Sequence, residues 1–127
     1  MATSQRRAFK KESGKRYKKD RGKRKFELAR PPSLTHVGEK VVRPFSVRGG
    51  NIKQRAVQLN EVTILEGKKK TKAKITSVTA NPANRHFIRM AVITKGAIVE
   101  TDKGKVKVTN RPGQEGHVQG ILVKEQK

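Results

Sequence analysis

The chain has 127 residues, with 32 Lys and Arg against 10 Asp and Glu, which gives a formal net charge of +22. Its length favours one domain, but a hydrophobic content of 32% is too low for the whole chain to share one core. The sequence contains no cysteine, which excludes disulfides and thiolate metal sites, and no apolar run approaches the roughly 20 residues of a membrane span. A charge this large repels itself unless it meets a polyanion such as nucleic acid or an anionic membrane.

The first 30 residues are the most basic part of the chain. They hold 13 Lys and Arg against three acids, a net charge of +10, and the other 97 residues carry +12. Before residue 25 only Phe9 and Tyr17 offer a sizeable side chain to bury, so we predict an intrinsically disordered extension that orders on binding. A solvated tail, a nuclear-import patch and a transit peptide are the alternatives. Tyr17 and Phe26 lie between the charges, which favours nucleic acid because aromatic rings stack on bases.

The segment 23–30 contains good helix formers and ends before Pro31-Pro32, so it predicts a short turn or helix. We expect its Phe26 and Leu28 to pack onto the domain. Residues 31–38 then form a linker, so that residues 1–36 make up the basic extension and linker.

From Val37 onward the apolar residues alternate with polar ones between regularly spaced turns, which is typical of short strands. The pattern predicts an all-β fold: a small β-barrel-like domain of about six short strands over residues 37–127, with a short C-terminal tail. Residues 86–94 fit either a strand or a helical turn. The predicted strands cover residues 40–47, 53–60 with a continuation at 62–65 after a kink, 72–80, 97–101, 105–110 and 117–123. A basic loop is predicted at 67–70, a turn at 81–84 and a loop at 111–116. The side chains expected to face inward are Val57, Leu59, Ile75, Val78, Val106 and Val108.

The turn at Gly49-Gly50-Asn51 joins two of these strands into a hairpin. Glycine accepts a positive φ without steric cost, so we expect at least one positive φ here. The turn would bring Arg48, Lys53 and Arg55 together at one end of the hairpin. Three like charges at a turn gain from an anionic partner.

The remaining motifs give no catalytic constellation. His36, His86 and His117 have no metal-site spacing, although a zinc site stays open in three dimensions. Residues 113–116 match a Gly-x-x-Gly backbone clamp, but Glu115 would repel phosphate, so a structural turn is the better interpretation. Asn84-Arg85-His86 with Arg89 is a second basic cluster, either a solvated face or a phosphate contact.

Six motifs then occur in a recognisable order: Ser13-Gly14, Lys23-Arg24-Lys25-Phe26-Glu27-Leu28, Arg48-Gly49-Gly50-Asn51, Asn81-Pro82-Ala83-Asn84-Arg85, Ile93-Thr94-Lys95-Gly96-Ala97-Ile98-Val99 and Arg111-Pro112-Gly113-Gln114. With them the chain resembles the small-subunit ribosomal protein family S-eight-e (S8e) of archaea and eukaryotes, in its archaeal form, along nearly its whole length. Lys15 and Ala29 stand where the family usually has glycine, which bears on the local conformation of the extension.

The resemblance implies a structural component of the small ribosomal subunit in the cytoplasm, with a β-barrel-like body and a basic extension threaded into ribosomal RNA. It implies small-subunit rRNA and neighbouring ribosomal proteins as partners, without enzymatic activity, cofactor, metal, membrane or small-molecule substrate. Two alternatives stay open: a chromatin-like basic barrel that binds duplex DNA, and an rRNA-processing enzyme or its subunit.

The residues expected to bind rRNA are the cations and Tyr17 of the extension and the basic turns of the domain. In the extension they are Arg6, Arg7, Lys10, Lys11, Lys15, Arg16, Tyr17, Lys18, Lys19, Arg21, Lys23, Arg24, Lys25 and Arg30. In the domain they are Arg48, Gly49, Gly50, Asn51, Lys53, Arg55, Asn84, Arg85, His86, Arg89 and Arg111.

Overall fold

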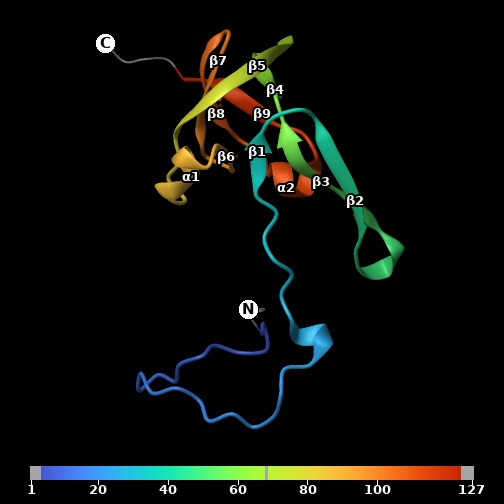
Figure 1. Cartoon of the computed structure of the whole chain (residues 1–127), viewed down its shortest axis with the longest axis vertical. Helices are drawn as coiled ribbons and strands as arrows, with labels where there is room; N and C mark the ends of the chain where they lie inside the picture. The colour runs from blue at the N-terminus through green and yellow to red at the C-terminus, as the bar shows by residue number, and fades with distance from the viewer. Residues whose placement is uncertain (1–3, 68, 124–127) are drawn as a thin grey trace. The chain divides into compact units, whose positions relative to one another are not determined.

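The computed structural model describes residues 4–67 and 69–123, and the chain divides into two compact units, Met1–Pro32 and Ser33–Lys127. Three parts of the sequence-based predictions lie outside the described residues: the first three residues of the extension, Lys68 of the basic loop and the C-terminal tail, residues 124–127. Every strand that the described residues form lies in the second unit (Figure 1).

Five strands of the second unit form a closed barrel. They are β4 (Glu61–Glu66), β5 (Lys69–Ala80), β7 (Ile98–Thr101), β8 (Gly104–Val108) and β9 (Gln119–Leu122), paired in that order. The barrel closes where β9 pairs in parallel with β4, with Thr63 opposite Gln119. The predicted all-β, barrel-like fold is therefore confirmed, and the last predicted strand closes it.

The core fills the inside of this barrel with small branched side chains. Its fully or nearly fully buried members include Val62, Ile64, Ile75, Val78, Val99, Val106, Val108 and Val118. Each such side chain stabilises the fold by about 1.5–3 kcal/mol relative to an exposed one. The alternation on β8, where Val106 and Val108 are buried and Lys105 and Lys107 are exposed, was predicted correctly.

Gly120 lets β9 approach β8 closely. A Cβ atom at this position would overlap Cγ1 of Val106 and lie 2.8 Å from the carbonyl oxygen of Lys107. A larger residue would therefore push β9 away from the barrel.

The other four strands form a second sheet in the order β2-β3-β1-β6. Their bounds are β1 (Thr35–Val37), β2 (Val41–Ser46), β3 (Ile52–Leu59) and β6 (Val92–Ile93). Strand β1 lies in the segment expected to be a linker: it pairs in parallel with β3, and the Thr35 hydroxyl donates to the Ala56 carbonyl at 2.8 Å. The described residues thus form nine strands where about six were expected.

Strands β2 and β3 run on past the rest of the sheet as a two-stranded ribbon, called here the arm (Val41–Leu59) (Figure 1). Its far end is the short 3-10 turn η2 (Arg48–Gly50). The pairing slips between Val41 and Val42, which face Gln58 and Ala56, so Val57 is the extra residue of a bulge. For this reason the prediction that Val57 faces inward is wrong, and Ala56 is buried instead.

Two single-turn helices complete the second unit. Helix α1 (His86–Arg89) precedes β6, so the ambiguous segment 86–94 contains both a helical turn and a strand. Helix α2 (Pro112–Glu115) replaces the predicted loop and packs against β3. It ends at Gly116 with φ 75°, where a Cβ would lie 3.0 Å from Cβ of Gln54.

Candidate nucleic-acid interface

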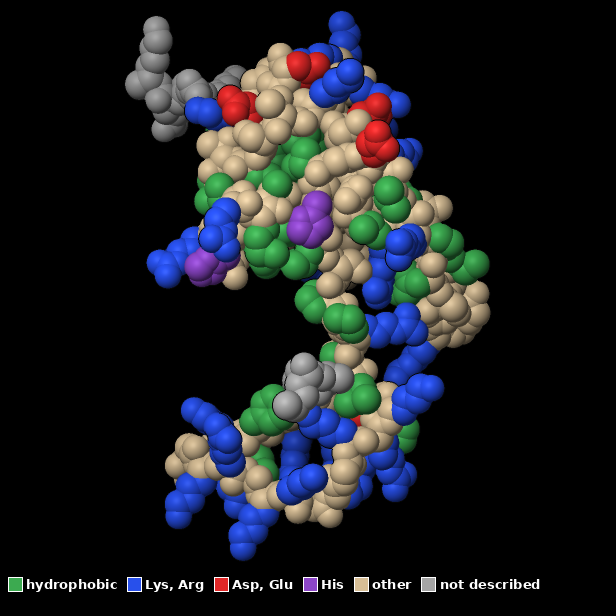
Figure 2. Space-filling view, viewed as in Figure 1, with side chains coloured by type: hydrophobic (Ala, Val, Ile, Leu, Met, Phe, Trp, Pro, Cys, Tyr) green, Lys and Arg blue, Asp and Glu red, His purple; other side chains and the backbone are tan. Residues whose placement is uncertain are grey.

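The basic side chains lie on the surface of both units. Among the described residues every Lys and Arg is exposed except Arg21 and Arg55, which are half-buried. In the second unit, Figure 2 shows the acidic side chains of the visible face lying over the barrel and none over the arm. The sequence agrees, because the arm contains four cations and no Asp or Glu.

The first unit folds back on itself twice. Lys10 pairs with Arg16 around a turn in which Gly14 has φ 77°, and Ser4 pairs with Leu28 next to the short 3-10 helix η1 (Lys25–Glu27). Phe26 lies in this helix, and its side chain is 71% exposed within the unit. The expectation that it packs onto the domain stays a prediction.

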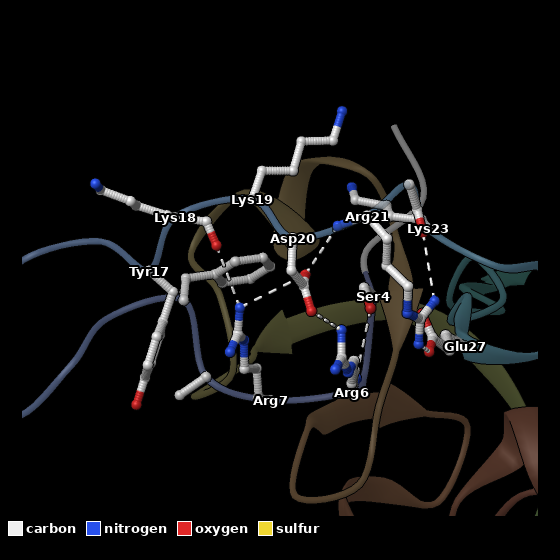
Figure 3. Close-up of a pocket in the computed structure, with 13 residues that line it drawn as sticks. Ser4, Arg6, Arg7, Tyr17, Lys18, Lys19, Asp20, Arg21, Lys23 and Glu27 are labelled. Atoms are coloured by element: carbon white, nitrogen blue, oxygen red, sulfur yellow. Dashed lines mark hydrogen bonds and ion pairs between the residues drawn. The ribbon is translucent and has the colours of Figure 1, made fainter.

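Two acids of this unit, Asp20 and Glu27, form ion pairs with its arginines. Asp20 accepts a hydrogen bond from Arg6 at 2.6 Å and lies 3.8 Å from Arg7 (Figure 3). The Arg6 hydrogen bond is the main cause that lowers the pKa of Asp20 to about 2. Arg21 pairs with Glu27 and lowers the pKa of that carboxyl as well. Neither acid was singled out from the sequence, because their partners are 14 and six residues away.

Tyr17 is already engaged by cations. The Arg7 guanidinium lies 4.3 Å and the Lys11 ammonium 5.5 Å from the centre of its ring, which is 41% exposed. The predicted base-stacking residue therefore belongs to a small cation–aromatic cluster, and Tyr17 and Arg7 both line the pocket of the first unit that Figure 3 draws.

The predicted glycine turn lies at the tip of the arm. Gly49 and Gly50 have φ values of 75° and 73°, which confirms the expectation of a positive φ. The turn is held by Val47 N–H donating to the Asn51 carbonyl at 2.8 Å, and by the Asn51 side chain donating to the Arg48 carbonyl at 3.3 Å. The backbone of Gly49 and Gly50 and the side chain of Arg48 therefore lie at the tip of the arm.

The other two cations expected at this turn lie further along β3. Lys53 is opposite Phe45, and Arg55 is opposite Arg43 in the middle of the ribbon. Arg48, Lys53 and Arg55 are therefore spread along the arm, and Arg43 joins them on it.

The second basic cluster is positioned by a buried asparagine that the sequence presented as an ordinary turn residue. Asn81, 6% exposed, donates to the Val92 carbonyl at 3.1 Å and accepts from Ala83 N–H and the Thr94 hydroxyl at 3.1 and 2.9 Å. These bonds tie the turn before α1 to strand β6. Asn84, Arg85, His86 and Arg89 then follow on an exposed turn, where the Asn84 side chain accepts from His86 N–H at 2.9 Å.

A second buried asparagine, Asn110, ties together the segment that begins at Arg111. Asn110 donates to the His117 carbonyl at 2.8 Å and to the Glu115 carboxylate at 3.0 Å, and accepts from Gln119 N–H at 2.9 Å. The hydrogen bond from Asn110 is the main cause that lowers the pKa of Glu115. Residues 113–115 lie in helix α2 and Gly116 ends it, while Arg111 stands exposed directly before the helix.

Over residues 4–67 and 69–123, no group of three or more His, Asp or Glu side chains could hold a metal ion, and no helix is long and apolar enough to cross a membrane.

Comparison with known proteins identifies the family. A family model described as Ribosomal protein S8e matches residues 4–123. A protein of Nanoarchaeum equitans named small ribosomal subunit protein eS8 is 48% identical over 114 residues, which cover 87% of this chain and 89% of that protein. Proteins of the same name from Methanobrevibacter smithii and Sulfurisphaera tokodaii are 44% and 43% identical, over 97% and 92% of this chain and 100% and 94% of their own. The chain therefore belongs to the S8e family of ribosomal proteins.

Proposed function

We propose that this protein is a structural constituent of the small ribosomal subunit that binds and stabilises folded ribosomal RNA. The relatives named above are small-subunit proteins, and the similarity covers nearly the whole chain. The proposal includes rRNA and neighbouring ribosomal proteins as partners, a place in cytoplasmic ribosomes, and no catalytic step.

The observation that carries the proposal is the separation of charge in the second unit. Four of its six described acids, Glu61, Glu66, Glu100 and Asp102, lie on β4, on β7 or in the turn after β7. The stretches 41–59 and 81–99, which hold the arm, α1 and β6, contain seven Lys and Arg and no acid. A surface of one sign suits a phosphate backbone, because each cation that neutralises a phosphate releases a bound counterion.

The proposed mechanism divides the work between the two parts of the chain predicted from the sequence, the extension (residues 1–36) and the domain (residues 37–127). The extension neutralises crowded phosphates through the 13 cations and Tyr17 predicted above. The domain presents Arg48 to Arg55 on the arm, the turn from Asn84 to Arg89, and Arg111. Rigid elements fix the register on RNA, and the recognition is of RNA shape rather than of a linear sequence.

A competition filter-binding assay tests this proposal against the duplex-DNA alternative. Labelled small-subunit rRNA is bound by the full chain and challenged with unlabelled rRNA or with duplex DNA of equal phosphate content. We expect the rRNA to compete at least tenfold better at 150 mM salt. Equal competition by duplex DNA would favour a chromatin-like barrel and contradict the proposal.

A further inference from the structure

Four side chains share the outward side of the arm. In an antiparallel pair, residues directly opposite each other point to the same side of the ribbon. Val42 and Ala56 form one such pair and pack in the core, so their side faces inward. The alternate pairs, Arg43 with Arg55 and Phe45 with Lys53, therefore face outward. These four residues are called here the outer arm face.

The outer arm face places like charges against each other. Arg43 and Arg55 are direct cross-strand partners, an arrangement that costs stability when no counter-charge is near. The arm contains no acid that could compensate them. The pair therefore gains from an anionic ligand, for which two guanidinium groups can each present paired N–H donors to phosphate oxygens.

The same face holds a planar stack. The Arg55 guanidinium lies 3.6 Å from the centre of the Phe45 ring, which is stacking distance. Arg55 is also one of only two described cations that are half-buried, so its side chain is held in place along the ribbon. A guanidinium with one flat side on a ring offers its other flat side to a further planar group, and nucleobases stack on both arginine and aromatic planes.

We propose that the outer arm face binds an unpaired nucleobase of RNA, which extends the Phe45–Arg55 stack while Arg43 and Lys53 contact the flanking phosphates. The inference rests on the proposed function and deepens it, because it names single-stranded RNA as the substrate class of the arm. A double-stranded RNA helix can contact only the cations of the outer arm face, since its bases are already stacked on one another. Phe45 and Arg43 were not among the binding residues expected from the sequence.

The test uses the full chain and two probes: a 12-nucleotide single-stranded RNA with a central 2-aminopurine, and an RNA duplex of the same length. Phe45→Leu keeps an apolar residue in the strand but removes the ring. We expect it to bind the single strand about tenfold more weakly, as loss of one base–aromatic stack predicts. Binding of the duplex should change less than twofold, and the salt dependence should stay the same because no charge is lost. The variant should also quench the fluorescence of the 2-aminopurine less than the parent does.

Two further variants separate stacking from folding. Arg55→Lys keeps the charge without the planar group, so we expect the same selective loss for the single strand. Ile52→Ala is the matched control: it removes an apolar side chain that is 71% exposed, on the other side of the same arm, and should change neither affinity.

Three results would overturn the inference. Equal losses for single strand and duplex would mean that Phe45 only supports the arm. No loss for either probe would mean that the face binds no base, and an acidic protein would then be the better partner. If Ile52→Ala weakened binding of the single strand as much as Phe45→Leu does, the base could not be assigned to the outer arm face. Failure of the parent to bind structured rRNA is a separate result, which contradicts the proposed function itself.

Discussion

Deleting residues 1–30 should flatten the salt dependence of rRNA binding more than neutralising the arm does. The deletion removes 13 cations, whereas Arg48→Gln, Lys53→Gln and Arg55→Gln together remove three. The truncated chain should still fold, because every buried core side chain belongs to the second unit.

The size of the effect can be estimated from the cations that the deletion removes. Arg6, Arg7 and Arg21 already face Asp20 or Glu27, and we take about half of the other ten cations of the deleted segment to contact phosphates. At roughly 0.7–0.9 in log K per log salt for each phosphate, the deletion lowers the slope by about 4, and the triple variant lowers it by at most about 3. Between 50 and 200 mM salt, a slope of about 4 corresponds to an affinity factor of about 250.

The assay is binding to an rRNA fragment and to bulk RNA across a salt series, for the parent, the truncation and the triple variant. The triple variant should mainly reduce the preference for the rRNA fragment, because rigid contacts fix register and flexible ones do not. Circular dichroism of each variant checks folding. A truncation with the parent's slope would mean that the extension is solvated or serves in targeting, and would refute the division of labour.

Three further predictions concern what holds the surface in place. Gly120→Ala should destabilise the second unit by about 2 kcal/mol through overpacking against Val106, measured by urea unfolding; an unchanged midpoint would show that β9 has room. Asn81→Ala should cost about 1–3 kcal/mol, because it leaves the Val92 carbonyl, Ala83 N–H and Thr94 hydroxyl unpaired, while the exposed Asn84→Ala should cost less. The pKa of Asp20 is lowered from 3.8 to about 2, so its contact with Arg6 should be fully formed above pH 3.8 and lost as the pH falls through about 2. A carboxyl NMR titration measures this, and a midpoint near 3.8 would mean that the contact is not formed in solution.

Local sequence patterns correctly predicted the features of the fold that depend on interactions between residues close together in the chain. The alternation of Val106 and Val108 with lysines and the two positive φ values at Gly49 and Gly50 needed no long-range information. The pairs β4–β5 and β7–β8 join strands that follow each other directly in the chain across short turns. The basic loci on the arm, on α1 and beside α2 could be named for the same reason.

Pairings between distant segments could not be predicted in this way. Strand β1 looks like a linker because it is three residues long, and its parallel pairing with β3 depends on a segment 22 residues further on. The bulge at Val57 breaks the period of two, so the alternation rule put the wrong side chain in the core. Asn81 and Asn110 resemble any turn asparagine until their distant partners are known. The Phe45–Arg55 stack likewise exists only because the hairpin register makes them diagonal neighbours.

Ultraviolet cross-linking on intact small ribosomal subunits, with the cross-linked peptides identified by mass spectrometry, tests the central claim most directly. The account predicts rRNA cross-links in the extension, the arm and the turn from Asn84 to Arg89, and few or none on the acid-bearing strand β7. Absence of the protein from washed subunits, or cross-links concentrated on β7 with none on the arm, would contradict it.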